Sequence, residues 1–200
     1  MALARRSTSY LLTMLVVTAA ASCSGADGGG GADRTVDDGE EATTSSSETS
    51  DPVLAERDEP LPVVTPTPRG IRWLGPDVPV PSTVDLIAAD GVGAPTIDAV
   101  IEAVERAGAG DVRVTPAGES HPAASPAGLT VRVATVDDDT AVSRLAFAGV
   151  DVPPDLPPEG YALAAYTRDD GTADVVLAGA DDAGAFYAAQ TLRQLTGDGT

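Results

Sequence analysis

Adjacent carboxylates are the clearest candidates for chemistry in this sequence. They occur at three places, Asp137–Asp138–Asp139, Asp169–Asp170 and Asp181–Asp182. A pair of carboxylates can hydrolyse a glycosidic bond, with one as general acid and the other as nucleophile, base or stabiliser. Aspartate is also favoured at the start of helices and in tight turns, and each site has such a local interpretation. Because caps and turns are the commoner roles, we predict two helix starts and one turn, none of them catalytic.

Other residue types that often support catalysis are scarce. His121 is the single histidine, and it lies in the Pro- and Ala-rich stretch PAGESHPAASP, where we expect an exposed loop histidine. Cys23 is the single cysteine, so an internal disulfide framework and a CxxC metal site are both excluded. The glycines at 28–31 follow no predicted strand and make no phosphate-binding loop. The sequence therefore predicts no catalytic, metal or cofactor site in this chain.

The charge balance excludes one class of partner. Twelve basic residues, all arginine, stand against 31 acidic residues, which gives a formal net charge of −19. Nucleic acids and anionic membrane surfaces are bound through basic patches. The charge therefore argues against a nucleic acid or an anionic membrane surface as a partner, and the acidity itself indicates solubility.

Residues 1–22 are predicted to be a signal peptide. Arg5 and Arg6 precede the apolar run 11–21, which has the length of a signal-peptide core. As a helix this run would cross only about half of a ~30 Å hydrocarbon layer, which argues against a permanent membrane span. The ending AASC resembles a bacterial lipoprotein signal, in which the cysteine, here Cys23, becomes the acylated N-terminus. Ala20 departs from the usual leucine, and the alternative is ordinary secretion with an incidental cysteine.

Residues 23–60 are predicted to be a disordered acidic linker. From residue 24 to residue 60 the chain has eleven acidic residues, two arginines and no aromatic residue. Such a segment cannot bury enough apolar surface to offset its ordering entropy, and its like charges extend it. It would hold a domain away from the membrane surface at which Cys23 is anchored.

From residue 61 the pattern changes to that of one folded domain, which we place at 61–197. Apolar and alternating runs predict strands within 70–75, 79–91, 111–116 and 128–136. Apolar residues at helical spacing predict a helix over 97–106, capped by Thr96 and ended by Gly108. A shorter helix is predicted within 137–149. Trp73 is expected to pack under a sheet edge, with contact to a sugar ring as the alternative.

The C-terminal part has the strongest hairpin signal. Tyr161 and Leu163 alternate with small residues on the first strand, Asp170–Gly171 suits a tight turn, and 175–177 form the returning strand. A final helix follows, with alanines and leucines on one face and with Gly184 where we expect close backbone approach. The order of elements predicts an α+β domain: a mostly antiparallel or mixed sheet with helices packed on one face.

The hairpin and the last helix also resemble a known family. EGYALAAY, a short turn and VVLAGADDAGAFYAAQTLRQL resemble the N-terminal domain of bacterial β-N-acetylglucosaminidases of glycoside hydrolase family 84, and family 20 has a related domain. The resemblance rests on Glu159, Gly160, Tyr161, Ala178, Gly179, Gly184, Tyr187, Gln190, Thr191, Leu192 and Leu195. It covers residues 62 to 196, and Ala188 stands where glycine is common.

The resemblance implies that the chemistry lies elsewhere. In the family this domain precedes a (β/α)₈ barrel in which the substrate's acetamido oxygen attacks the anomeric carbon and two neighbouring aspartates assist. The barrel is absent from this chain, so we assign no catalytic residue, and Asp181–Asp182 is not the family's catalytic pair. By itself the chain is expected to be inactive.

The expected whole is a secreted β-N-acetylglucosaminidase or β-N-acetylhexosaminidase on the outer face of a bacterial cell membrane. Its expected partners are the barrel of the same polypeptide, the glycan bound by that barrel, and the membrane through lipidated Cys23. The alternative is a stand-alone cell-surface lipoprotein that binds carbohydrate or another partner.

Overall fold

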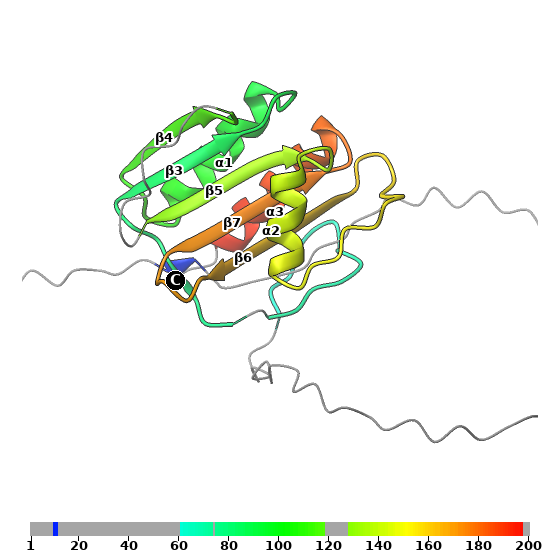
Figure 1. The fold of residues 1–200 in the computed structure, drawn as a ribbon. Helices are drawn as coiled ribbons and strands as arrows, with labels where there is room; N and C mark the ends of the chain where they lie inside the picture. The colour runs from blue at the N-terminus through cyan, green and yellow to red at the C-terminus, as the bar shows by residue number, and fades with distance from the viewer. Residues whose placement is uncertain (1–9, 12–60, 74, 119–127, 198–200) are drawn as a thin grey trace, which may run out of the picture.

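A five-stranded sheet forms the centre of the domain (Figure 1). The computed structural model describes residues 10–11, 61–73, 75–118 and 128–197. The strands of the sheet are β3 (Thr83–Ala88), β4 (Asp111–Pro116), β5 (Leu129–Thr135), β6 (Tyr161–Thr167) and β7 (Ala173–Gly179). Their order across the sheet is β4–β3–β5–β7–β6. Only β6 pairs antiparallel within this sheet, and the other three pairings are parallel, so the sheet is mixed.

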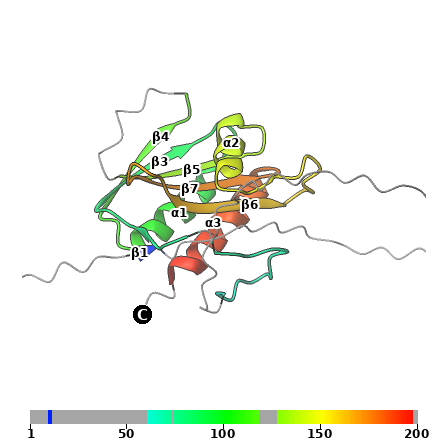
Figure 2. The same ribbon diagram turned by 60° about the horizontal axis from the view of Figure 1, so that its bottom comes forward.

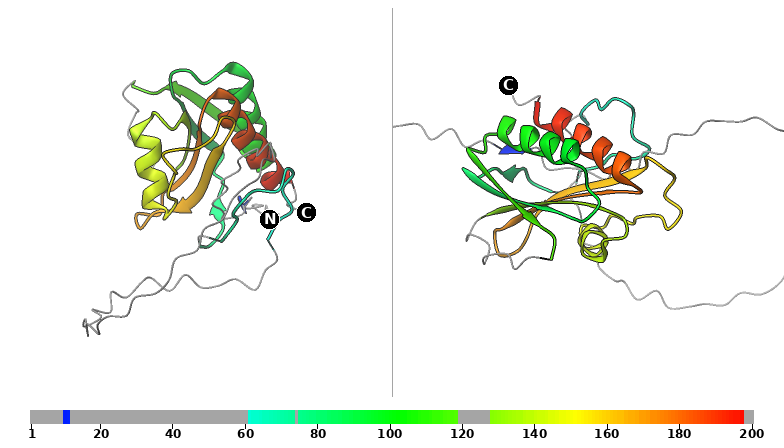
Figure 3. Two further views of the ribbon diagram at one scale, coloured as in Figure 1. Left: turned by 90° about the vertical axis from the view of Figure 1, so that its right-hand side faces the viewer. Right: turned by 90° about the horizontal axis from the view of Figure 1, so that it is seen from above.

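Three helices cover the sheet: α1 (Ala94–Arg106), α2 (Asp139–Phe147) and α3 (Asp182–Gly197). Helices α1 and α3 lie side by side on one face, and α2 lies on the opposite face (Figures 2 and 3). The predicted α+β class and mixed sheet are confirmed. The expectation of helices on one face holds for α1 and α3, whereas α2 packs on the other face.

The two-sided covering explains the composition of the hairpin. Residues of β6 and β7 alternate between a large core under α1 and α3 and a smaller core under α2. Leu163 and Leu177 belong to the large core, while Ala162, Ala164 and Val176 belong to the smaller one. A strand covered on both faces has an almost continuous apolar sequence, and both strands of the hairpin show it.

The start of α1 differs from the prediction. The N-cap residue is Gly93, with Pro95 in the first turn, and Thr96 is a buried residue inside the helix. Proline suits this position because the first helical N–H groups have no partner within the helix. The end of α1 is as predicted: Gly108 has a positive φ of 110°, and its N–H donates to the carbonyl of Glu105 at 2.9 Å.

The strand predicted at 70–75 is not present in the described part of that segment. Trp73 still packs against the large core, as expected. Downstream, the short strand β2 (Val78–Pro79) pairs antiparallel with β1 (Tyr10–Leu11). Prolines at 76, 79 and 81 remove backbone donors, which keeps the segment from joining the main sheet as a long strand.

The segment that leads into the domain is fixed to the last helix. The Thr65 N–H donates to Oε1 of Gln194 at 2.9 Å, and Nε2 of Gln194 donates to the Thr65 carbonyl at 2.9 Å. The neighbouring Val64 is buried in the large core. The first and last parts of the domain therefore lie together.

The junction between the hairpin and α3 depends on glycine. A Cβ atom placed on Gly184 would overlap the carbonyl oxygen of Gly160, and one placed on Gly179 would overlap the backbone N of Ala185. The backbone of α3 thus approaches the ends of β6 and β7 with no room for a side chain. The close approach expected at Gly184 is confirmed.

The variant Gly184→Ala shows whether this backbone contact outweighs helix propensity in the free energy of unfolding, because the two effects have opposite signs. Alanine favours an isolated helix over glycine by about 1 kcal/mol, but the overlap with the Gly160 carbonyl forces the backbone to move. We expect a net loss of about 2 kcal/mol in the free energy of unfolding, measured by urea denaturation. Gly70→Ala is the control, because apart from its own chain neighbours no atom lies within 4 Å of its added Cβ. A stabilising effect of Gly184→Ala would contradict the close approach.

Candidate functional site

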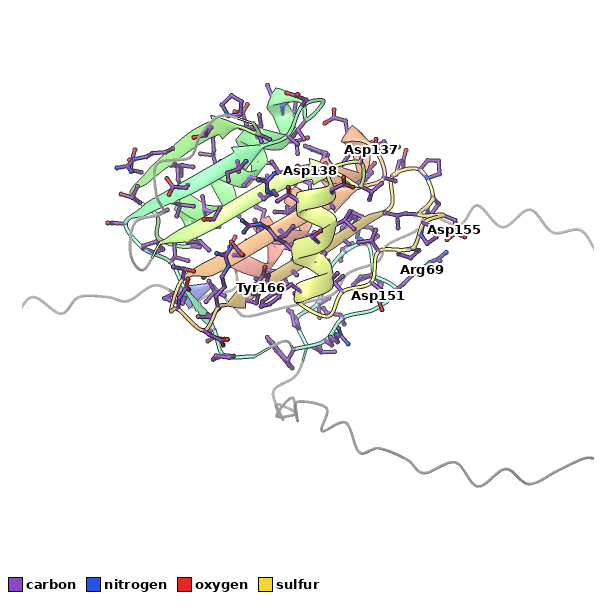
Figure 4. All side chains as sticks on the ribbon, in the orientation of Figure 1. Arg69, Asp137, Asp138, Asp151, Asp155 and Tyr166 are labelled. Carbon is purple, nitrogen blue, oxygen red and sulfur yellow. The ribbon has the colours of Figure 1, made fainter. Side chains whose placement is uncertain are left out.

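The first acidic cluster begins α2 (Figure 4). One carboxylate oxygen of Asp138 accepts the N–H groups of Thr140 at 2.8 Å and Ala141 at 3.0 Å. The other oxygen binds Nη1 of Arg132 at 2.8 Å, and both side chains of this ion pair are largely buried. Asp138 is therefore the predicted helix cap, and its remaining charge is neutralised by a strand arginine.

The second acidic pair lies in the β6–β7 turn. Oδ1 of Asp170 accepts the Thr172 N–H at 2.9 Å and the Thr172 hydroxyl at 2.6 Å. The hydroxyl bond, followed by the backbone bond, lowers the pKa of Asp170 below its usual value. Gly171 supplies the positive φ of 82° that the turn needs, so the predicted turn role is confirmed.

The third acidic pair begins α3 and also reaches α1. Asp181 accepts the Gly184 N–H at 2.8 Å and the Glu159 N–H at 3.2 Å. Asp182 accepts the Gly93 N–H at 2.8 Å, and the Thr96 hydroxyl lies 3.4 Å from the same oxygen. The cap role is confirmed for Asp181. Asp182 does more than was predicted, because it binds the start of a second helix.

A buried charge cluster centred on Asp174 was missed by the sequence reasoning. The Asp174 side chain is 1% exposed. Its Oδ1 accepts a hydrogen bond from Nη1 of Arg144 at 2.7 Å. Its Oδ2 accepts three hydrogen bonds: from Nε of Arg168 at 2.7 Å, from Nη2 of Arg168, and from the Tyr166 hydroxyl at 3.0 Å. One signal was available, since Asp174 is a charged residue inside the apolar run of β7.

The ion pairs and the hydrogen bond of the Asp174 cluster connect β7 to α2 and β6. Arg144 comes from α2, Tyr166 from β6 and Arg168 from the turn after β6. Burial, and then the neighbouring Asp174 charge, raises the pKa of Tyr166 to about 12, so this hydroxyl remains a donor at neutral pH. The large core holds a comparable tyrosine: burial raises the pKa of Tyr161, whose hydroxyl lies 2.6 Å from Oγ1 of Thr191. The hydroxyl groups of Tyr161 and Tyr166 therefore each have a hydrogen-bond partner within the fold.

Asp174→Asn tests whether the charge cluster holds α2 on the sheet. The amide would leave two arginines without their counter-charge, so we expect a loss of about 3 kcal/mol in the free energy of unfolding. Asp111→Asn is the matched control: its pair with Arg113 spans 3.8 Å, and both side chains are more than half exposed. We expect the control to change stability by no more than about 0.5 kcal/mol in the same urea titration. Equal effects of the two variants would contradict the structural role of Asp174.

Two sequence candidates, His121 and Cys23, lie outside the described residues. Within the described ranges, no three His, Cys, Asp or Glu side chains are grouped so that they could hold a metal ion. The same part of the chain contains no helix long and apolar enough to cross a membrane. The carboxylates singled out above instead bind backbone N–H groups, hydroxyls and arginines, which stabilises the fold.

Residues 61–200 match the family model described as glycosyl hydrolase family 20, domain 2. No curated protein matches the chain. A solved structure described as "Structure of CpGH84D" matches with a TM-score of 0.41 and 10% identity, over 58% of this chain and 19% of that one. This chain thus spans about one fifth of that solved chain. Because the family model covers more than half of the sequence, the chain belongs to the family of domain 2 of glycosyl hydrolase family 20.

Proposed function

We propose that this chain is the N-terminal, non-catalytic part of an enzyme that removes terminal N-acetylglucosamine or a related hexosamine from glycans. The observation that supports the proposal is the match of residues 61–200 to an accessory domain of a hexosaminidase family. In the proposed whole enzyme, a barrel domain follows. There the acetamido oxygen of the substrate attacks the anomeric carbon while two barrel aspartates assist.

The geometry of the carboxylates supports a non-catalytic role for this domain. A general acid must hold a proton at the substrate oxygen, within hydrogen-bond distance of it. Asp138, Asp170 and Asp181 instead accept backbone N–H groups of their own helix or turn. Asp174 is enclosed by two arginines and a tyrosine. These groups are already used to hold the fold.

The outer side of α3 is the surface on which we propose that the barrel packs. This side shows Ala183, Tyr187 and Gln190 and bears no charge between Asp182 and Arg193, with Tyr187 40% exposed. The outer side of α1, by contrast, shows acidic residues such as Glu102 and Glu105. The centres of protein interfaces are depleted in charge and enriched in aromatic residues. The contrast favours α3 as the docking face.

Hydrolysis of a chromogenic N-acetylglucosaminide tests the proposed division of labour. The 200-residue chain should release no chromophore above the uncatalysed rate, whereas the longer gene product that contains the barrel should turn over. Activity of the 200-residue chain would contradict our assignment of the chemistry to the barrel. A reading frame that stops after Thr200 would instead favour a stand-alone binding lipoprotein.

We further propose that the protein is exported and anchored through lipidated Cys23, with residues 24–60 as an acidic tether. Three acyl chains on one cysteine would be sufficient for stable anchoring. Cleavage before Cys23 would also remove β1, which contributes only a two-residue pairing with β2. The folded domain would keep its five-stranded sheet.

Fractionation of cells that express Cys23→Ser tests the anchor. The wild-type chain should be recovered with membranes and extracted by detergent, and the variant should lose this association. A matched control combines Cys23→Ser with Ser46→Cys, which keeps one cysteine in the chain but places it in the linker. Membrane recovery of the Cys23→Ser chain at the wild-type level would disprove lipidation at this position.

A further inference from the structure

An aromatic ring is exposed at the C-terminal end of α2. Phe147 is 72% exposed, although it is a large apolar residue. Its ring lies against that of Tyr166, with centroids 5.7 Å apart and planes tilted by 44°. Tyr166 is held in turn by its hydroxyl bond to Asp174, and Figure 4 shows it near the end of α2 that lies away from Asp138. Phe147 therefore has a fixed support on one side and solvent on the other.

Two guanidinium groups bind the carboxylate that also accepts the hydroxyl of Tyr166, the residue on which Phe147 packs. The bonds to Asp174 use Nη1 of Arg144 and both Nε and Nη2 of Arg168. They leave Nη2 of Arg144 and Nη1 of Arg168 as donors that Asp174 does not use. The two arginine side chains are 29% and 34% exposed, so they are open to solvent in part.

The two guanidinium groups are suited to a second carboxylate. Arg144 and Arg168 share the single carboxylate of Asp174, and Arg168 also lies near the carboxylate of Asp170 in the β6–β7 turn. Guanidinium groups match carboxylates in geometry and can bind both oxygens at once. An aromatic face offers contact area to the apolar C–H face of a pyranose ring. The combination fits a sugar ring with a carboxylate.

We propose that Phe147, Arg144 and Arg168 form a contact site for an anionic sugar residue, a pyranose with a carboxylate, within the glycan on which the enzyme acts. The inference depends on the proposed function for its ligand. The site lies on the α2 face of the sheet, opposite the α3 surface proposed for the barrel. It therefore remains accessible when that surface is covered.

Binding of two matched glycosides to the 200-residue chain tests the site. Methyl glucuronide and methyl glucoside differ only at C6, which is a carboxylate in the first and a hydroxymethyl group in the second. Binding is measured by the NMR chemical-shift changes of backbone amides. Methyl glucuronide should shift amides around 144–147 and 166–168 and bind more weakly at high salt, while methyl glucoside should bind at least about ten-fold more weakly. Phe147→Ala and Phe147→Leu should each weaken glucuronide binding by about ten-fold.

Tyr187→Ala is the matched control, because Tyr187 is an exposed aromatic on the opposite side of the domain. It should leave glucuronide binding unchanged. Equal binding of the two glycosides, unchanged binding by both Phe147 variants, or no shift with either glycoside would overturn the proposal. Hydrolysis of N-acetylglucosaminides by the longer gene product is measured separately. Failure of the sugar site is thus distinguishable from failure of the proposed function.

Discussion

The contact between the start of α3 and the ends of the hairpin strands is the constraint on which the domain depends. Backbone meets backbone at Gly160, Gly179 and Gly184, and none of the three has space for a Cβ atom. Because α3 begins directly after β7 at this contact, its direction across the sheet is set there. Asp182, in the first turn of α3, then binds the N–H of Gly93 and sets the position of α1. One junction thus orients both helices of that face.

Asp182 acts on α1 as the acidic residue of a capping box acts on its own helix. In a capping box, a side chain in the first turn accepts the N–H of the N-cap residue. Here the N-cap is Gly93 and the acceptor comes from a different helix, 89 residues later. A Cβ atom on Gly93 would lie 2.9 Å from Oδ2 of Asp182, which explains why this cap is glycine and has no side chain of its own. The carboxylate is close to the positive ends of both helix dipoles, where negative charge is favoured.

Local features could be predicted from the sequence, and long-range ones could not. Helical spacing, the turn at Asp170–Gly171 and the cap at Asp138 depend on neighbours within a few residues, and the structure confirms them. The predicted N-cap at Thr96 was wrong. The helix begins earlier, and its true start depends on Asp182, which is far away in the sequence. The Asp174 cluster was missed for the same reason, since its partners come from separate elements.

The sequence predicted that helices cover one face of the sheet, but not that α2 covers the other face. A continuous apolar strand such as β7 has the same sequence whether its second face meets a helix, another sheet or a partner. Helix α2 connects β5 to β6 across that second face, and β7 pairs between these two strands. No local pattern in 137–149 reports that pairing.

The reciprocal hydrogen bonds between Thr65 and Gln194 have a mechanical consequence. They join two residues 129 positions apart, one near the beginning of the domain and one near its end. A force that pulls residue 61 away from residue 197 is therefore carried first by this short bridge. Until this bridge breaks, the sheet and its two cores lie outside the direct load path.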